Sequence, residues 1–199
     1  MLMTLQEAVT DLHRVAVVRK RTQSPQRLQG LANYCIQELD RRGIEGVERE
    51  ATIPGAGRPK GWDVAWKFQD KYRLAISLKS ILRNLAGTVP NRIDDLMGET
   101  ANVQLHSPEI VVGYMMIFDV STDHASAKRG ATWCDLVAQR LEQLSGRKPP
   151  AWSIGMVEAS FLIRVNFGSG PRLLTAEVDV APFFDSLVEQ VRSRNPSLR

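Results

Sequence analysis

The chain has 199 residues, of which 43% are hydrophobic and 24% are charged. This composition excludes a disordered chain and fits one folded domain with a sizeable core. The sequence holds 26 Lys and Arg against 22 Asp and Glu, a net charge of +4, which by itself does not identify a nucleic-acid-binding protein. No apolar run is long enough for a transmembrane helix, and the N-terminal segment does not resemble a secretory signal. We therefore expect a cytoplasmic protein that does not enter a membrane.

Hydrophobic periodicity predicts alternating helices and strands along the chain. The run 111–120 is almost continuously apolar, which is typical of a central strand buried on both faces. In chain order we predict a helix at 4–19, a helix from 25 to about 42, strands at 46–53, 62–68 and 72–79, a loop or short helix at 81–90, a helix at 91–105, a strand at 111–120, a helix at 129–144, strands at 155–167 and 172–179, and a helix at 182–194.

This order predicts an α/β fold in which a mixed central β-sheet is flanked by helices. We expect a single domain over 1–199, with a core at about 28–180 and with the helices 4–19 and 182–194 at its periphery. Between Arg14 and Arg27 the chain carries basic residues and no acid. Such a run fits a solvated helix end as well as a phosphate-binding patch.

Several familiar sites are missing from the sequence. Cys35 and Cys134 form no CxxC pair, which excludes a cysteine zinc site and argues against a disulfide scaffold. The glycine-rich stretch 54–61 lacks the Ser or Thr that completes a phosphate-binding loop. The three histidines have no metal-ligand spacing, so we interpret them as structural or surface residues.

The strands 62–68 and 72–79 carry the residues that could take part in catalysis. Asp63 opens the first strand, and Ser77 and Lys79 lie near the end of the second. Side chains alternate along a strand, so Ser77 and Lys79 project to one face while Leu78 points into the core. A hairpin around residues 69 and 70 brings Asp63 opposite them, where its carboxylate and the Leu78 carbonyl could hold a divalent cation. A structural interpretation is also open, with Asp63 as a polar strand start and Lys79 as an exposed charge.

The segment resembles the PD-(D/E)XK nuclease superfamily. In its pattern an aspartate opens a strand, and an acid, any residue and a lysine follow on the next strand. Asp63 and Lys79 match this pattern, whereas Trp62 replaces a proline and Ser77 replaces the second acid. One branch of type II restriction endonucleases is similar in having Ser-x-Lys, with the missing carboxylate on a helix downstream. The resemblance implies a restriction-endonuclease-like core and a Mg²⁺ cofactor, with Mn²⁺ as a substitute.

The resemblance places the replacement acid on the helix predicted to begin at Asn91. If Ile93, Leu96, Met97 and Ala101 define its buried side, Asp94 falls at the rim of that side, and Asp95 points away from it towards Glu99. We therefore predict Asp94 as the second metal ligand and Asp95 as a solvated charge. The family also often has a glutamate on its first core helix, which Glu38 could match; Glu50 is a competing candidate.

These expectations define three hypotheses. The first is a divalent-metal-dependent endonuclease of restriction type, which acts on double-stranded DNA as a homodimer with Asp63, Ser77, Lys79, Asp94 and Glu38 as its catalytic residues. The second is a repair or defence nuclease of the same fold without strict sequence recognition. The third is a non-catalytic nucleic-acid-binding or scaffolding protein in which Ser77 marks a lost site.

Overall fold

The structure, a computed structural model, describes residues 2–21 and 24–198. Helices and strands alternate along the chain in nearly the order that the sequence predicts. They are α1 (Leu5–Leu12), α2 (Gln29–Asp40), β1 (Glu48–Ile53), β2 (Lys60–Phe68), β3 (Lys71–Ile81), α3 (Leu85–His106), β4 (Val111–Asp119), α4 (Trp133–Gln143), β5 (Ala159–Asn166), β6 (Arg172–Leu173) and α5 (Ala181–Arg194), with short π or 3₁₀ segments η1 (His13–Val18), η2 (Pro25–Leu28) and η3 (Glu177–Val180).

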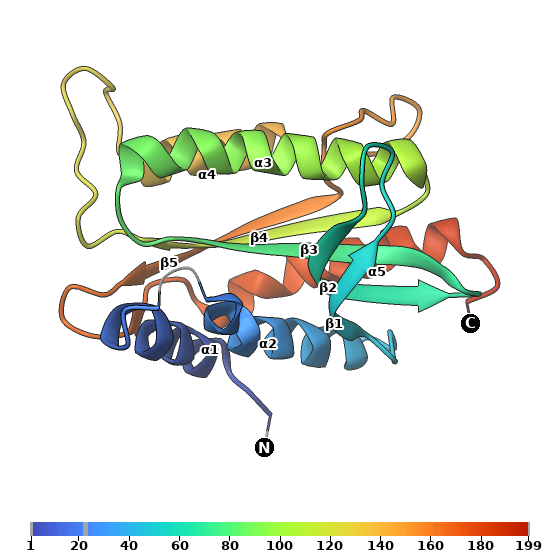
Figure 1. The fold of residues 1–199 in the computed structure, drawn as a ribbon, viewed down its shortest axis with the longest axis horizontal. Helices are drawn as coiled ribbons and strands as arrows, with labels where there is room; N and C mark the ends of the chain where they lie inside the picture. The colour runs from blue at the N-terminus through green and yellow to red at the C-terminus, as the bar shows by residue number, and fades with distance from the viewer. Residues whose placement is uncertain (1, 22–23, 199) are drawn as a thin grey trace.

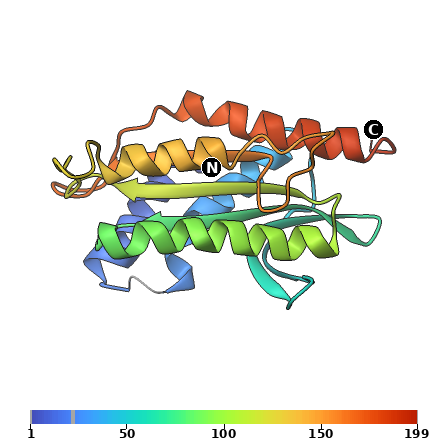
Figure 2. The same cartoon turned by 90° about the horizontal axis from the view of Figure 1, so that it is seen from above.

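The strands form one open, mixed sheet in the order β1-β2-β3-β4-β5-β6. β1, β2 and β3 are antiparallel neighbours, β3, β4 and β5 are parallel, and β6 returns antiparallel to β5. The parallel pairs are connected through α3 and α4. Both helices lie on the same face of the sheet, and α1, α2 and α5 cover the other (Figures 1 and 2). The predicted α/β fold with a mixed, helix-flanked sheet is confirmed.

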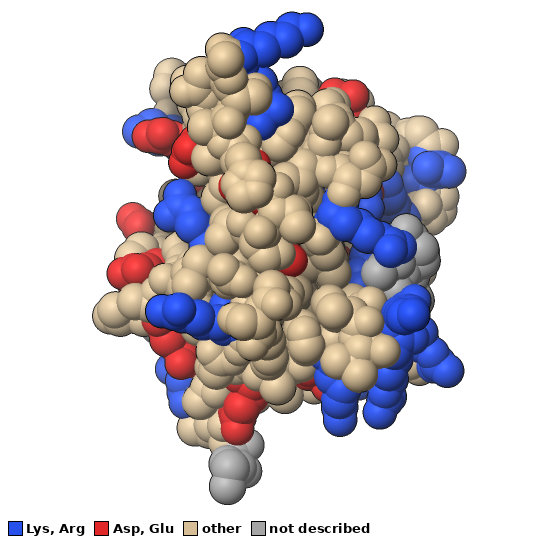
Figure 3. Space-filling model, turned by 90° about the vertical axis from the view of Figure 1, so that its left-hand side faces the viewer, with Lys and Arg blue, Asp and Glu red and all other residues tan. Residues whose placement is uncertain are grey.

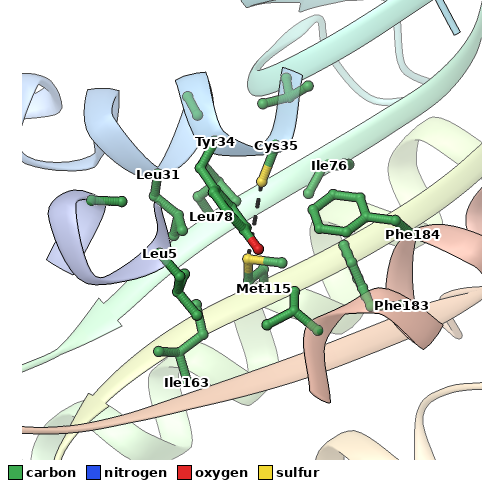
Figure 4. Close-up of a cluster of buried hydrophobic side chains, with 14 of the residues drawn as sticks. Leu5, Leu31, Tyr34, Cys35, Ile76, Leu78, Met115, Ile163, Phe183 and Phe184 are labelled. Carbon is green, nitrogen blue, oxygen red and sulfur yellow. Dashed lines mark hydrogen bonds between the residues drawn. The ribbon is translucent and has the colours of Figure 1, made fainter. Parts of the chain in front are cut away.

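The face covered by α1, α2 and α5 holds the larger of two apolar clusters. Apolar side chains from these helices meet those of β3, β4 and β5, and Cys35 of α2 is free and buried among them (Figure 4). Cys35 Sγ lies 4.0 Å from Met115 Sδ. The residues labelled in Figure 4 are Leu5, Leu31, Tyr34, Cys35, Ile76, Leu78, Met115, Ile163, Phe183 and Phe184.

The two terminal helices belong to this core. We expected the helices 4–19 and 182–194 at the periphery, but Leu5 and Leu12 of α1 and Phe184 and Leu187 of α5 are almost fully buried. Each helix therefore contributes apolar side chains to the core. Burying one large side chain fully stabilises the fold by about 1.5–3 kcal/mol. Among the described helices, none combines the length and the hydropathy that crossing a membrane requires.

Two predicted elements differ from the structure. α3 begins at Leu85, six residues before the predicted start at Asn91, and continues through Pro90. A proline in the early turns removes one backbone hydrogen bond, and the burial of Leu85 and Val89 against the sheet offsets that loss. The strand predicted at 172–179 is confined to β6, and the segment from Glu177 to Val180 is a 3₁₀ turn.

Candidate functional site

The candidate site begins where β2 leaves β3. β2 pairs with β3 from Val64, which lies opposite Ile76, to Phe68. Among the described residues, those of β2 before Val64 are paired only with β1, where Trp62 lies opposite Ala51. Asp63 lies at this separation, and its Oδ2 accepts a hydrogen bond of 2.7 Å from the backbone N–H of Leu78. The carboxylate thus takes the place of the backbone carbonyl that would accept from the N–H of Leu78 if the two strands stayed paired.

Ser77 and Lys79 project towards α3, on the same face of β3, as the alternation of side chains predicts. Ser77 Oγ lies 3.4 Å from Glu99 Oε2, and Lys79 Nζ lies 3.2 Å from the same oxygen. Leu78 points to the opposite face, where it is 1% exposed in the apolar cluster. The structure therefore brings one hydroxyl, one ammonium and one carboxylate together beside Asp63.

A second lysine completes the group. Lys60 Nζ, at the first residue of β2, lies 2.5 Å from Glu99 Oε1. The preceding loop is fastened to α3 by Asn102, whose side chain accepts from the N–H of Gly57 at 2.8 Å and donates to the carbonyl of Arg58 at 2.9 Å. This contact fixes the start of β2 beside the C-terminal half of α3. We refer to Asp63, Ser77, Lys79, Glu99 and Lys60 together as the candidate site.

Burial of the Asp63 carboxyl raises its pKa. The Glu99 charge acts in the same direction, whereas the hydrogen bond from Leu78 and the charges of Lys79 and Arg27 oppose it. Asp63 is thus a carboxylate whose ionised form the fold destabilises and a nearby cation would favour. Such a shift is frequent at functional sites, although structural ion pairs produce it as well.

Glu99, and not Asp94, lies beside Ser77 and Lys79. The prediction for Asp94 assumed a buried side that includes Met97, which is 45% exposed; the side chains of α3 that are buried near this point include Leu96. At 100° per residue Asp94 lies about 160° from Leu96 around the helix, and Glu99 lies about 60° from it. Asp94 is exposed on the surface of α3, so the predicted helical phase was wrong.

The other predicted acids lie apart from Asp63. Glu38 is buried near the end of α2, on the opposite face of the sheet from α3, where it forms ion pairs with Arg41 at 2.5 Å and Arg42 at 2.7 Å. Asp95 forms an ion pair with Arg92, and Glu50 is exposed on β1 with a φ of +55°. The structure does not bring Glu38 to the candidate site.

The sequence reasoning missed Glu99 and Lys60 as site residues. Glu99 is 20 residues beyond Lys79, farther than the dozen or so that the resemblance led us to search. A signal was present, because Glu99 falls three residues after Leu96 and four before Val103, both buried. Lys60 carried no such signal, since it stands in a glycine-rich stretch that reads as loop.

Of the candidate site, Lys60 and Glu99 border a hollow of about 450 Å³ beside α3, whose lining also includes Asp94 and Asp95. Within the described residues, no three His, Cys, Asp or Glu side chains are grouped as a metal centre. Asp63 and Glu99 nevertheless fit Mg²⁺, which is commonly held by one or two carboxylates while water and substrate phosphates fill the remaining positions. Leu78 contributes its N–H here, and a role for its carbonyl remains a prediction.

In comparisons with known proteins, no family model, no curated protein and no solved structure matches this chain. The conclusions about function therefore rest on the residues and the geometry of the candidate site.

Proposed function

We propose that the protein is a divalent-metal-dependent DNA endonuclease that hydrolyses phosphodiester bonds, with a restriction-endonuclease-like core of the PD-(D/E)XK type. The observation that carries the proposal is the convergence of Asp63, Lys79 and Glu99 where β2 and β3 separate. The resemblance implies a Ser-x-Lys motif with its acid displaced to a following helix. Glu99 on α3, beside Ser77, supplies a carboxylate in that arrangement.

Asp63 and Glu99 are the residues that would hold Mg²⁺, with Mn²⁺ as a substitute. When bound, the cation would neutralise charge on the phosphate and lower the pKa of a water. Lys79 carries a positive charge to the same place, where it can orient the water or stabilise the phosphate oxygens. Ser77 lies within hydrogen-bonding distance of Glu99 and helps to fix that carboxylate, since the strand offers no acid of its own.

DNA is the substrate that the charge distribution favours. Figure 3 views the molecule from the end at which β3 ends and α3 begins. Lys and Arg gather on one half of this surface. Arg83 is exposed in the segment between β3 and α3, and Arg19, Lys20 and Arg21 are exposed in the segment that follows η1. A duplex bound there would contact them through its phosphates. A homodimer acting on a palindromic site is part of the proposal, because a two-fold enzyme matches a two-fold sequence.

A non-catalytic nucleic-acid-binding protein is the second candidate. It is favoured by the contacts of Glu99, which lies within 3.4 Å of Ser77, Lys60 and Lys79 and so resembles a satisfied ion cluster. The two candidates differ in one respect: only in the nuclease would Asp63 and Glu99 hold a divalent cation.

Cleavage of supercoiled plasmid DNA tests the proposal. We expect nicked and linear products in Mg²⁺ or Mn²⁺, no products in EDTA, and no products from Asp63→Asn, which keeps the shape of the side chain and removes its charge. Discrete fragments would identify a restriction endonuclease, and a smear would identify a nuclease without strict sequence recognition. Folded wild-type protein that binds DNA and leaves it intact in both metals would reject the nuclease in favour of the second candidate.

A further inference from the structure

A second, smaller hollow of about 190 Å³ lies between η2, the end of β3 and the start of α3. Arginines contributed by all three regions surround it, and none of its lining residues is acidic. The polar residues that line it are Arg27, Ser80, Arg83, Asn84, Thr88 and Arg92. We refer to it as the arginine hollow.

The arginine hollow holds like charges close together. Arg27 Nε lies 3.3 Å from Ser80 Oγ, and its Nη1 donates to the Ser24 carbonyl at 2.9 Å, so the guanidinium is fixed by neutral oxygens. Burial lowers the pKa of Arg27 and the nearby charge of Arg92 lowers it further, whereas the charge of Asp63 acts in the opposite direction. Bringing cations together in a partly buried place is unfavourable unless an anion joins them.

Arg92 has a hydrogen-bond donor in the same region that is not used within the described part of the chain. Its Nη1 pairs with Asp95 at 2.7 Å, but its Nε is buried and has no partner among the described residues. A buried donor without an acceptor costs about 1–3 kcal/mol. An oxyanion in the arginine hollow would offset the repulsion between Arg27 and Arg92.

The arginine hollow is continuous with the candidate site. An intervening hollow shares Asn84, Thr88 and Arg92 with it, and shares Asp94 and Asp95 with the hollow beside Glu99. Along α3, seven residues separate Arg92 from Glu99, an axial distance of about 10 Å. Because a strand of duplex DNA rises about 3.4 Å per nucleotide along its axis, at most about three nucleotides fit within that distance.

We propose that the arginine hollow is a phosphate subsite, which binds an internal backbone phosphate of the cleaved DNA strand within about three nucleotides of the scissile phosphate. The proposal rests on the proposed function for the position of the scissile phosphate. Guanidinium groups suit this ligand because they donate paired hydrogen bonds to phosphate oxygens. A phosphate bound there would fix the strand relative to Asp63 and Glu99 and so contribute to the orientation of the scissile bond.

The test measures DNA binding and does not require cleavage. An oligonucleotide duplex without terminal phosphates is bound to the Asp63→Asn protein in EDTA, and the dissociation constant is determined over a range of salt concentrations. We expect Arg27→Gln and, separately, Arg83→Gln to weaken binding about tenfold and to reduce the salt slope by about one unit each. Arg140→Gln, a change at an exposed arginine on α4, is the matched control and should leave both quantities unchanged.

A scan of the duplex with single methylphosphonate substitutions locates the phosphate. In the Asp63→Asn protein one internal position should weaken binding about tenfold, and in the Arg27→Gln background that same position should have little further effect. Arg83→Gln repeats this comparison if Arg27→Gln does not fold.

If the methylphosphonate and Arg27→Gln weakened binding additively at every position of the duplex, the subsite would be overturned. Tighter binding that requires a terminal phosphate would also overturn the assignment to an internal one. If the scan succeeds and the wild-type protein never cleaves DNA, the subsite stands and the proposed nuclease fails. If the protein cleaves DNA and the scan shows no coupling, only the subsite fails.

Discussion

Two glutamates of this protein each lie between two cationic side chains, yet they occupy different kinds of environment. Glu158 accepts from Arg147 at 2.9 Å and from Arg194 at 2.7 Å, and the backbone N–H of Val112 donates to it at 2.6 Å. The Glu158 side chain has no exposed surface, and Trp152 lies within cation–π distance of both guanidinium groups. This cluster fastens α5 to the start of β4 and buries the Glu158 carboxylate completely.

Glu99 also lies between two cationic groups, but its side chain keeps about 10% of its surface exposed and both partners are lysines. Lys60 lies 2.5 Å and Lys79 3.2 Å from its oxygens, and the side chain borders a hollow of about 450 Å³. Lysine ammonium groups are compact charges on flexible chains, whereas two arginines hold a carboxylate in a fixed geometry. The comparison shows that a glutamate between two cations is not in itself a site; access and the mobility of its partners distinguish Glu99 from Glu158.

The largest expected effect is on catalysis at Glu99. Glu99→Gln should lower the single-turnover rate of DNA cleavage at least about a thousandfold, equivalent to about 4 kcal/mol in the barrier, because a metal-holding charge is removed. Asp94→Asn is the matched control at the exposed border of the same hollow, and it should change the rate less than about threefold because Asp94 lies about 140° from Glu99 around α3. Equal losses in both variants would place the replacement acid elsewhere on α3.

At Glu158 the expected loss is in stability. Glu158→Gln leaves Arg147 and Arg194 buried without a counter-charge, and should lower the free energy of unfolding by about 3–5 kcal/mol. Urea denaturation monitored by circular dichroism measures this quantity. Glu99→Gln, measured in the same way, should lose less than about 1 kcal/mol, because its lysines can turn towards water. A similar loss in both variants would remove the distinction between the two glutamates.

Replacing Lys79 should slow cleavage more than replacing Lys60. Lys79→Met should slow cleavage about a hundredfold, because its charge acts on Asp63 as well as on Glu99. Lys60→Met should slow cleavage about tenfold or less, since the Lys60 contact in this site is to Glu99. Single-turnover kinetics at saturating enzyme compare the two rates, and the reverse order would contradict these roles.

The smallest expected effect is a pH dependence of stability at Asp63. Its raised pKa means that the folded state binds the Asp63 proton more tightly than the unfolded state. The stability that the protonated form contributes is present below the ordinary pKa of about 3.9 and is lost as the pH rises through the folded pKa. Asp63→Asn stays neutral and can still accept from Leu78, so its melting temperature should exceed that of the wild type at pH 7 without metal.

The difference between Asp63→Asn and the wild type should shrink towards pH 3, and thermal melts over this range check it. Added Mg²⁺ should stabilise the wild type more than the variant. Asp63→Ala is the control for the hydrogen bond: like Asp63→Asn it stays neutral, and it should be about 1 kcal/mol less stable than Asp63→Asn at every pH because the N–H of Leu78 loses its acceptor. A wild type that is more stable than Asp63→Asn at pH 7 would contradict the direction of the pKa shift.

The hairpin shows how much of the candidate site the sequence could predict. Asp63, Ser77 and Lys79 share one strand pair, and the register of a hairpin follows from local alternation and a short connection. Their proximity could therefore be read from spacing alone. Glu99 was not predictable in this way, because its place depends on the phase of α3 against the sheet. That phase is set by the residues that pack on the sheet, and these include Leu96 and Val103 but not Met97, which is exposed.

The sequence by itself determined the elements, the mixed α/β sheet and the pairing of Asp63 with Ser77 and Lys79, because each depends on periodicity within a short segment. Only the tertiary structure decided which acid of α3 reaches that pair and that Lys60 joins it. Both depend on contacts between segments far apart in the chain, such as the one by which Asn102 fastens the loop before β2. Local patterns do not encode such contacts, since packing energy is shared among many residues.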